Sequence, residues 1–255
     1  MKKYNMSEKN IIKKAAAFAG KNMLGTITNV SVRQNAAALT FDDGPCPAYT
    51  VPLLNLLEKY KVKATFFLVG RQTEKFPYVV KRIIDAGHAI GNHSWNHPSF
   101  PLIDARERVK QILKCKKAML PYKTNLFRPP YGHQNVASRI EAFLLGYKVI
   151  AWNIAAEDWL NKSSQEMAEA VIARIQPGSI ILFHDYLYTT YELEYIAREQ
   201  AFGAIEIILK TLSGNFKFVT VPELLKMGKS VRQNWYSQEE KNFTSKLKME
   251  QTTNV

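Results

Sequence analysis

AAALTFDDGP, at residues 36–45, joins an apolar run to two adjacent carboxylates and a Gly-Pro pair. The apolar run predicts a buried strand over residues 36–41, and Gly44-Pro45 is typical of a turn. A turn alone would explain Asp42 and Asp43, because Asp accepts local backbone hydrogen bonds there. The other interpretation is a metal site with a spare base. Neighbouring side chains past a strand point to different sides, so one carboxylate can bind a cation while the other takes a proton from water.

Helices and strands alternate along the chain after this first strand. The sequence predicts strands over residues 64–69, 88–90, 126–128, 148–152, 179–183 and 217–220, and helices over residues 52–60, 78–86, 103–120, 137–145, 164–175 and 202–212. Such alternation predicts a parallel sheet covered by helices, either open or closed into a barrel. We find no internal repeat, and 255 residues are compatible with one domain of α/β-barrel size or with two domains.

The two ends of the chain carry most of its charge. The formal net charge is +13, with +6 in residues 1–33 and +3 in residues 226–255, so the body between them is nearly balanced. This distribution does not require a catalytic groove for polyanions, and we find no nucleic-acid-binding module. Residues 10–24 predict a basic amphipathic helix that packs against the domain or lies on a membrane surface, and residues 228–255 predict a polar, lysine-rich tail. The basic ends could contact anionic cell-wall polymers or membranes, and we expect a monomer.

Cysteine usage and the N-terminal segment bear on the compartment. Cys46 and Cys115 lack a C-x-x-C partner, which favours two unpaired thiols, although a disulfide between them is not excluded by the sequence. A signal peptide is disfavoured, because Lys13 and Lys14 interrupt the apolar segment and no small-x-small cleavage site follows. No stretch of the sequence approaches the roughly twenty apolar residues of a membrane-spanning helix.

Charged or imidazole groups follow five of the predicted strands, where the carboxyl ends of parallel strands collect functional residues. These groups are Asp42-Asp43, His93 with His97, Arg128-Pro129-Pro130-Tyr131-Gly132, Asp158-Trp159 and His184-Asp185. The i, i+4 spacing of His93 and His97 predicts that both rings lie on one face of a helical turn and converge on one cation. Because His-x3-His alone is a weak metal signal, the prediction depends on its combination with a carboxylate.

Taken in order, the motifs TFDDGP, HSWNHP, RPPYG, DW and ILFHD resemble the five motifs of the polysaccharide deacetylases, the NodB-homology domain of carbohydrate esterase family 4. The resemblance implies a distorted (β/α) barrel of seven or eight strands, with a single catalytic domain over residues 36–227 between a lead-in (1–35) and a tail (228–255). It also implies metal-dependent removal of acetyl groups from amino-sugar polymers or oligomers of the peptidoglycan or chitin type. Zinc is the expected divalent ion, with Co2+, Ni2+ and Mn2+ as alternatives.

The resemblance assigns roles in metal binding and in activating water. Asp43, His93 and His97 would bind the metal, which leaves positions open for water and the acetyl oxygen. Asp42 would be the general base, and Arg128 would hold it in place.

The remaining motif residues would act on the leaving group and on the acetyl group. His184 would protonate the leaving amine, and Asp158 would support it by favouring the imidazolium. The backbone N–H of Tyr131, held by Pro130 and Gly132, would contribute to the oxyanion hole. Two apolar side chains, Trp159 and Leu182, would wall a pocket for the acetyl methyl group.

Three other polar residues lie near the motifs without an assigned role. We expect His88 to be a structural histidine in or beside a strand and Asp185 to make structural hydrogen bonds. His133, on the loop after Tyr131, is either a substrate contact or a solvated loop residue.

Compared with the family pattern, residues 186–201 form a longer connection, and they include four tyrosines, at 186, 188, 191 and 195. We expect this insert to shape substrate choice by stacking on sugar rings, or to form a packed lid without substrate contact.

The motifs describe the acyl centre and leave the rest of the substrate open. One alternative is a related deacylase that acts on O-acetyl xylan or on a lipid-linked acylamino sugar. Another is a non-catalytic carbohydrate-binding relative, which is disfavoured because no base, ligand or acid is missing. The resemblance indicates the cell envelope or the extracellular space, whereas the lack of a clear signal peptide indicates the cytoplasm.

Overall fold

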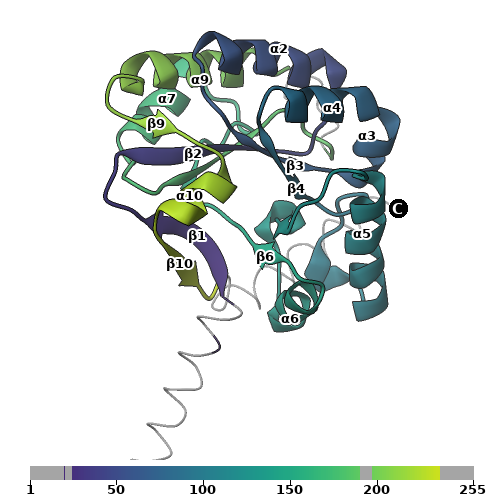
Figure 1. The fold of residues 1–255 in the computed structure, drawn as a ribbon. Coiled ribbons are helices and arrows are strands. Elements are labelled where there is room, and N and C mark those ends of the chain that lie inside the picture. Colours follow the sequence, from purple (N-terminus) through teal and green to yellow (C-terminus); the bar gives the residue numbers. More distant parts are fainter. Residues whose placement is uncertain (1–19, 21–24, 190–196, 236–255) are drawn as a thin grey trace, which may run out of the picture.

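A parallel sheet of eight strands forms the centre of the computed structural model, which describes residue 20, residues 25–189 and residues 197–235 (Figure 1). The order across the sheet is β6 (Lys148–Val149), β5 (Leu126–Phe127), β4 (Ala89–Asn92), β3 (Thr65–Leu68), β2 (Ala36–Asp42), β8 (Ile180–His184) and β7 (Ile154–Ala155), with β9 (Lys217–Phe218) paired with β2. Every pairing in it is parallel. The expected single-domain α/β barrel is confirmed, although in the described part of the chain β6 and β7 do not pair to close it.

Two further strands lie outside the region where the sequence predicted strands. β1 (Thr26–Ser31) and β10 (Lys229–Gln233) form an antiparallel pair. β1 also bridges to both sides of the main sheet, through Ile27 to Ile150 after β6 and through Asn29 to Ser179 before β8. This small sheet therefore lies across the open side of the barrel, and the start of the expected polar tail is a strand.

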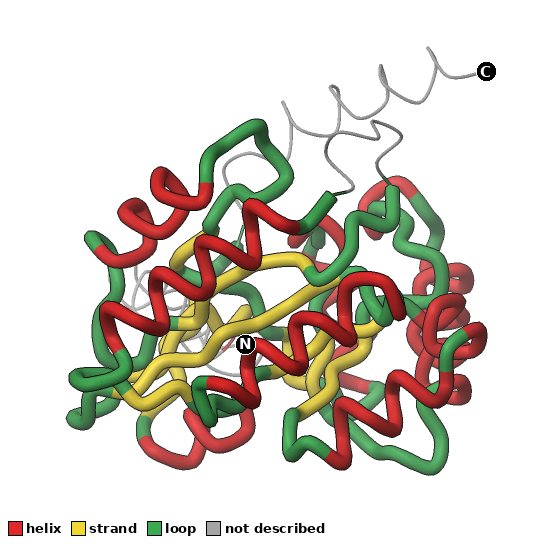
Figure 2. The backbone as a smooth tube through the Cα atoms, turned by 90° about the horizontal axis from the view of Figure 1, so that it is seen from above, coloured by secondary structure: helices red, strands yellow, loops and turns green. Residues whose placement is uncertain are grey.

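Helices surround the strands, as the view from above shows (Figure 2). They are α2 (Pro47–Lys59), α3 (Gly70–Lys75), α4 (Pro77–Asp85), α5 (Ala105–Ala118), α6 (Val136–Leu144), α7 (Ser164–Ile172), α9 (Glu199–Leu212) and α10 (Val221–Met227), with short 3-10 turns η1 (Phe100–Leu102) and η2 (Pro130–Gly132). The six predicted helices are present. α2 begins at Pro47 rather than at residue 52, because proline suits the first turn of a helix, and α3 and α10 were not predicted.

The core immobilises the strand that ends at the paired aspartates. All seven residues of β2 are buried. The ring of Phe41 lies 5.1 Å from that of Phe66 in β3 and 6.3 Å from that of Phe183 in β8. Because helices and strands cover β2 on every side, its carboxyl end has a fixed place in the fold.

Several expectations fall on residues outside the described part. These are nearly all of the amphipathic helix at 10–24, the tail from residue 236 and residues 190–196 of the insert. Among the residues that the structure does describe, no helix has the length and apolar character needed to cross a membrane.

Candidate active site

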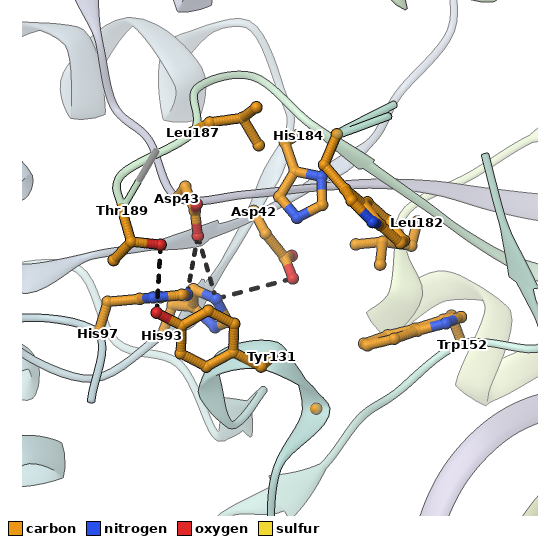
Figure 3. Close-up of a pocket in the computed structure, with 12 residues that line it drawn as sticks. Asp42, Asp43, His93, His97, Tyr131, Trp152, Leu182, His184, Leu187 and Thr189 are labelled. Carbon is orange, nitrogen blue, oxygen red and sulfur yellow. Dashed lines mark hydrogen bonds and ion pairs between the residues drawn. The ribbon is translucent and has the colours of Figure 1, made fainter. Parts of the chain in front are cut away.

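Strand register places two of the candidate catalytic residues side by side. Asp42 ends β2, His184 ends β8, and the two are paired in the parallel register. His93 directly follows β4, and Arg128 directly follows β5. The carboxyl ends of these strands open into one cavity of about 460 Å³, which the side chains in Figure 3 surround.

Three buried side chains form a site for a divalent metal ion. The Oδ1 atom of Asp43 lies 3.4 Å from Nε2 of His93 and 3.1 Å from Nε2 of His97. The three potential ligand atoms lie within 4.8 Å of one another. Asp43 Oδ1 is buried and has no hydrogen-bond partner in the described part of the chain, so this acceptor is available to bind a cation. The donor set therefore fits a divalent ion.

The protonation states of these ligands suit a cation. Burial opposes the charge of Asp43, but His97 and His93 outweigh it and hold the pKa of this carboxyl well below its ordinary value. Burial lowers the pKa of His97, which favours the neutral ring. The Nδ1 atom of His93 donates to the carbonyl oxygen of Arg128 at 2.7 Å, which leaves its Nε2 lone pair facing the site. An ionised carboxylate and neutral imidazoles are the forms that bind metals.

The predicted helical turn at the two histidines is wrong. Residues 93–98 are irregular, and both Ser94 and His97 have positive φ, 67° and 62°. The Oγ atom of Ser94 accepts a hydrogen bond from the backbone N–H of His97 and stabilises this tight loop. The rings of His93 and His97 nevertheless converge, with centroids 4.9 Å apart. A loop with left-handed residues therefore replaces the helical turn and still brings both rings to the cation site.

The two aspartates share one cavity instead of pointing to different sides. Asp43 has φ of 78°, which ends the strand alternation and turns its side chain into the same cavity as Asp42. The second carboxylate oxygen of Asp43, Oδ2, accepts the backbone N–H of Tyr188 at 2.9 Å. The insert thus holds one oxygen of Asp43 and leaves the other for the cation.

Asp42 has a different set of partners. Its Oδ1 accepts from Nη1 of Arg128 at 2.7 Å, and its Oδ2 lies 3.8 Å from Nε2 of His93. Arg128 is fully buried, also donates to the carbonyl oxygen of Ala151, and stacks 4.1 Å from the ring centroid of Phe67. The predicted Asp42–Arg128 contact is therefore present, and one oxygen of Asp42 faces the cavity without a strong donor.

His184 is held by Asp158 through two hydrogen bonds. Nδ1 of His184 lies 2.9 Å from Oδ1 of Asp158, and its backbone N–H donates to Oδ2 at 2.8 Å. Burial opposes the charged ring, but the Asp158 carboxylate outweighs it, and the pKa of His184 is raised to about 9. Trp159 packs edge-on against the ring at 5.5 Å. The structure thus brings His184 and Asp158, the expected acid and its partner, into direct contact.

Arg198, which was not predicted from the sequence, lies behind this pair. It is 2% exposed, and its Nη2 donates to the carbonyl oxygen of Asp158 at 2.6 Å. Its Nη1 lies 3.5 Å from Oδ2 of the same residue. Arg198 comes from the insert, where no motif or periodicity marks it, so no sequence signal could have identified it.

The cavity lining includes most of the predicted residues and several unpredicted ones. The lining residues are Asp42, Asp43, His93, His97, Tyr131, Gly132, Trp152, Trp159, Leu182, His184, Leu187 and Thr189 (Figure 3). Tyr131 has φ of 58° within η2, and its hydroxyl lies 3.1 Å from Oγ1 of Thr189. Pro130 is buried at the start of η2 and does not line the cavity. Trp152 could have been identified as an aromatic residue at the predicted end of a strand.

The three residues without an assigned role have different environments. Asp185 accepts from the backbone N–H of Gly44 and from the Thr50 hydroxyl, as expected of a structural carboxyl, and burial raises its pKa to about 7. His88 is buried and accepts from the backbone N–H of Ala64, also as expected. His133 is not solvated, because it is 7% exposed and its Nδ1 lies 3.1 Å from Oγ of Ser99.

Both cysteines are free thiols, Cys46 partly exposed and Cys115 buried, so the disulfide alternative is excluded in this structure. In the insert, the ring of Tyr186 stacks on Tyr49 with centroids 6.4 Å apart, and the ring of Tyr188 lies 6.1 Å from that of His97. The other two tyrosines of the insert lie outside the described residues.

The fold and the site together define a parallel (β/α) barrel with a divalent-metal site at the carboxyl ends of its strands. Residues 29–150 match the family model described as polysaccharide deacetylase. Over 194 residues the chain is 36% identical to a peptidoglycan-N-acetylglucosamine deacetylase of Bacillus cereus, covering 74% of this chain and 87% of that protein. The chain therefore belongs to the polysaccharide deacetylase family.

Two other comparisons agree with this assignment. The chain is 35% identical over 198 residues to the peptidoglycan-N-acetylmuramic acid deacetylase PdaC of Bacillus subtilis, covering 76% of this chain. That match spans only 40% of the length of PdaC. The solved structure of the Bc1960 peptidoglycan N-acetylglucosamine deacetylase superposes with a TM-score of 0.72 and 31% identity, covering 80% of this chain and 94% of that chain.

Proposed function

We propose that the protein is a metal-dependent hydrolase that releases acetate from N-acetylated amino-sugar polymers or oligomers. The observation that carries the proposal is the arrangement of three kinds of groups, metal ligands, a carboxylate and an imidazole, around one cavity. A ligand set of Asp43, His93 and His97 lies between a carboxylate held by Arg128 and an imidazole held by Asp158. The names of the relatives, which include deacetylases of peptidoglycan and of chitooligosaccharides, agree with this substrate class.

We propose zinc as the ion, because one carboxylate and two imidazoles are a common ligand set of catalytic zinc with open positions. When bound, the ion would supply Lewis acidity toward water and toward the acetyl carbonyl oxygen. Asp43, His93 and His97 would hold it, with Asp43 restricted to one ligand oxygen because Tyr188 occupies the other.

The protein groups would move two protons during the reaction. Asp42 would accept the proton of the attacking water at Oδ2, the oxygen that is not bonded to Arg128. As the C–N bond breaks, His184 would donate a proton from Nε2 to the amine nitrogen, because Asp158 occupies Nδ1 and favours the imidazolium. The products are acetate and a free amine. The backbone N–H of Tyr131 would stabilise the developing oxyanion, and Trp159 and Leu182 would contact the acetyl methyl group.

Acetate release from N-acetylglucosamine oligomers tests the proposal. We expect release by the zinc-loaded protein, its loss with a chelator and its return on adding zinc. Asp42→Asn should abolish turnover while keeping the bound metal. Asp85→Asn, at an exposed carboxylate paired with Lys81, is the matched control and should keep both turnover and the bound metal.

Two results would contradict this assignment. Loss of metal from the Asp42→Asn variant would mean that Asp42, not Asp43, is the carboxylate ligand. Chelator-sensitive acetate release from O-acetyl xylan, but from no N-acetylated sugar, would mean that the protein hydrolyses an ester and not an amide.

A further inference from the structure

A second cavity, of about 720 Å³, lies next to the catalytic cavity and has a polar lining. The residues around it are Arg71, Gln72, Glu74, Lys75, Asn96, Tyr186, Tyr188 and Thr189. Thr189 lines both cavities, so the two share a wall. Asn96 lies in the loop between the two histidine ligands, and the backbone N–H of Tyr188 bonds Asp43. A polymer whose acetamido group enters the catalytic cavity therefore has its neighbouring units within reach of the second one.

The charges of the second cavity are predominantly positive. Arg71 and Lys75 both belong to α3 with i, i+4 spacing, and both are exposed to solvent. Within the part of the chain that the structure describes, neither has an ion-pair partner, whereas Lys81 on the next helix is paired with Asp85. Among the described residues of the lining, Glu74 is the one carboxylate. Two cations without an ion-pair partner among the described residues thus face a cavity that a ligand can enter.

The remaining lining groups suit a charged sugar. The guanidinium of Arg71 presents parallel N–H groups that match a carboxylate, and Lys75 adds a second positive charge. The side-chain amides of Gln72 and Asn96 can donate to hydroxyl or carbonyl oxygens. The ring of Tyr188 offers an aromatic edge or face to a sugar ring. This combination recognises an anionic, hydroxyl-rich unit better than a neutral one.

We propose that the second cavity is a subsite that binds a carboxylate on a sugar unit next to the one that is deacetylated. The inference rests on the proposed function and deepens it, because it names the preferred substrate as a carboxylate-bearing amino-sugar polymer. Glycans of the peptidoglycan type carry such a group on a lactyl ether, or on a peptide attached to it. Chitin-type oligomers carry none.

Kinetics on three glycans of equal length would test the subsite. One is an uncharged N-acetylglucosamine oligomer, one carries free lactyl carboxylates, and one carries the same lactyl groups capped by a short peptide with its own carboxylates. Arg71→Ala should raise KM on the preferred carboxylated glycan about tenfold more than KM on the uncharged oligomer, with little effect on kcat. Arg71→Lys should restore part of the difference, and added salt should reduce it. Whichever charged glycan responds identifies the source of the carboxylate.

The control is Lys81→Ala, which removes an exposed cation of α4 that lines neither cavity. It should leave all three KM values as in the parent protein. Equal KM values of the parent protein for charged and uncharged glycans would overturn the proposal. An Arg71→Ala variant in which KM rises by the same factor for charged and uncharged glycans would also overturn it.

Binding measurements separate this proposal from the proposed function. Calorimetric titration of the zinc-loaded Asp42→Asn variant with the same glycans reports affinity without turnover. Tighter binding of a carboxylated glycan, lost in the Asp42→Asn, Arg71→Ala double variant, supports the subsite even if the parent protein releases no acetate. Equal binding of all glycans rejects the subsite even if acetate release is confirmed.

Discussion

Replacing Asp158 by asparagine should remove the interaction that keeps His184 charged. Asp158 accepts from both Nδ1 and the backbone N–H of His184. An amide in its place can accept from the backbone N–H, but its NH2 group then faces Nδ1 and favours the neutral ring. Size and burial change little, so the perturbation is mainly electrostatic.

The magnitude follows from the pKa of His184 in the metal-free protein. Burial of the ring opposes its charge, and Asp158, with smaller contributions from Asp43 and Asp42, raises the pKa from 6.5 to about 9. The difference corresponds to roughly 3 kcal/mol of folding free energy. Because the folded pKa lies above the unfolded one, this stability is fully present below pH 6.5 and is lost as the pH rises through about 9. In Asp158→Asn the burial is no longer offset, and the pKa of His184 should fall toward or below its ordinary value.

The assay is denaturant unfolding of metal-free parent and variant at about pH 6 and about pH 10. Other groups titrate in this range in both proteins, so the informative quantity is the difference in the free energy of unfolding between parent and variant. The parent should be the more stable protein at the lower pH, and this difference should shrink by up to roughly 3 kcal/mol at the higher pH. An NMR titration of the His184 ring gives its pKa directly. A parent–variant difference that does not change with pH, together with an unchanged ring pKa, would refute the reasoning.

Three other predictions follow from the same site. Arg128→Met should destabilise the fold by about 3–5 kcal/mol, because it leaves Asp42 buried without its guanidinium partner. A loss of less than about 1 kcal/mol in the free energy of denaturant unfolding would contradict this. Arg198→Met should lower kcat about tenfold with a smaller effect on KM and shift the alkaline limb of the pH profile, because Asp158 loses a charged donor; an effect on KM alone would exclude this role. Zinc should raise the unfolding midpoint of the parent protein and leave that of Asp43→Ala unchanged, and equal responses would place the ion elsewhere.

The position of the site was predictable because it depends on chain order and strand direction. In a parallel sheet the carboxyl ends of all strands meet at one edge. Residues that end or directly follow β2, β4, β5 and β8 must therefore lie near one another, and Asp42, His93, Arg128 and His184 do. The alternation of helices and strands predicted the parallel sheet and its helical cover, whereas the barrel was implied by the resemblance to the polysaccharide deacetylases.

The two strands at the ends of the domain could not be predicted in the same way. β1 reads TITNVS and β10 reads KSVRQ, both short and mostly polar, and each lies beside a basic segment. Their pairing joins residues about two hundred positions apart. Neither sequence carries a local signal of that partner, because the stability of the pair comes from tertiary contact.

The directions of the metal-binding side chains and of Tyr131 depend on backbone conformations that sequence spacing does not report. Four residues at the site, Asp43, Ser94, His97 and Tyr131, have positive φ, although none is glycine. Such conformations cost free energy unless surrounding contacts impose them, and at Asp43 the contact comes from the N–H of Tyr188, 145 residues away. An aspartate with ordinary strand geometry would direct its carboxylate away from Asp42. The paired aspartates therefore act in one cavity because the insert after His184, and not the TFDDGP motif alone, fixes where the second carboxylate points.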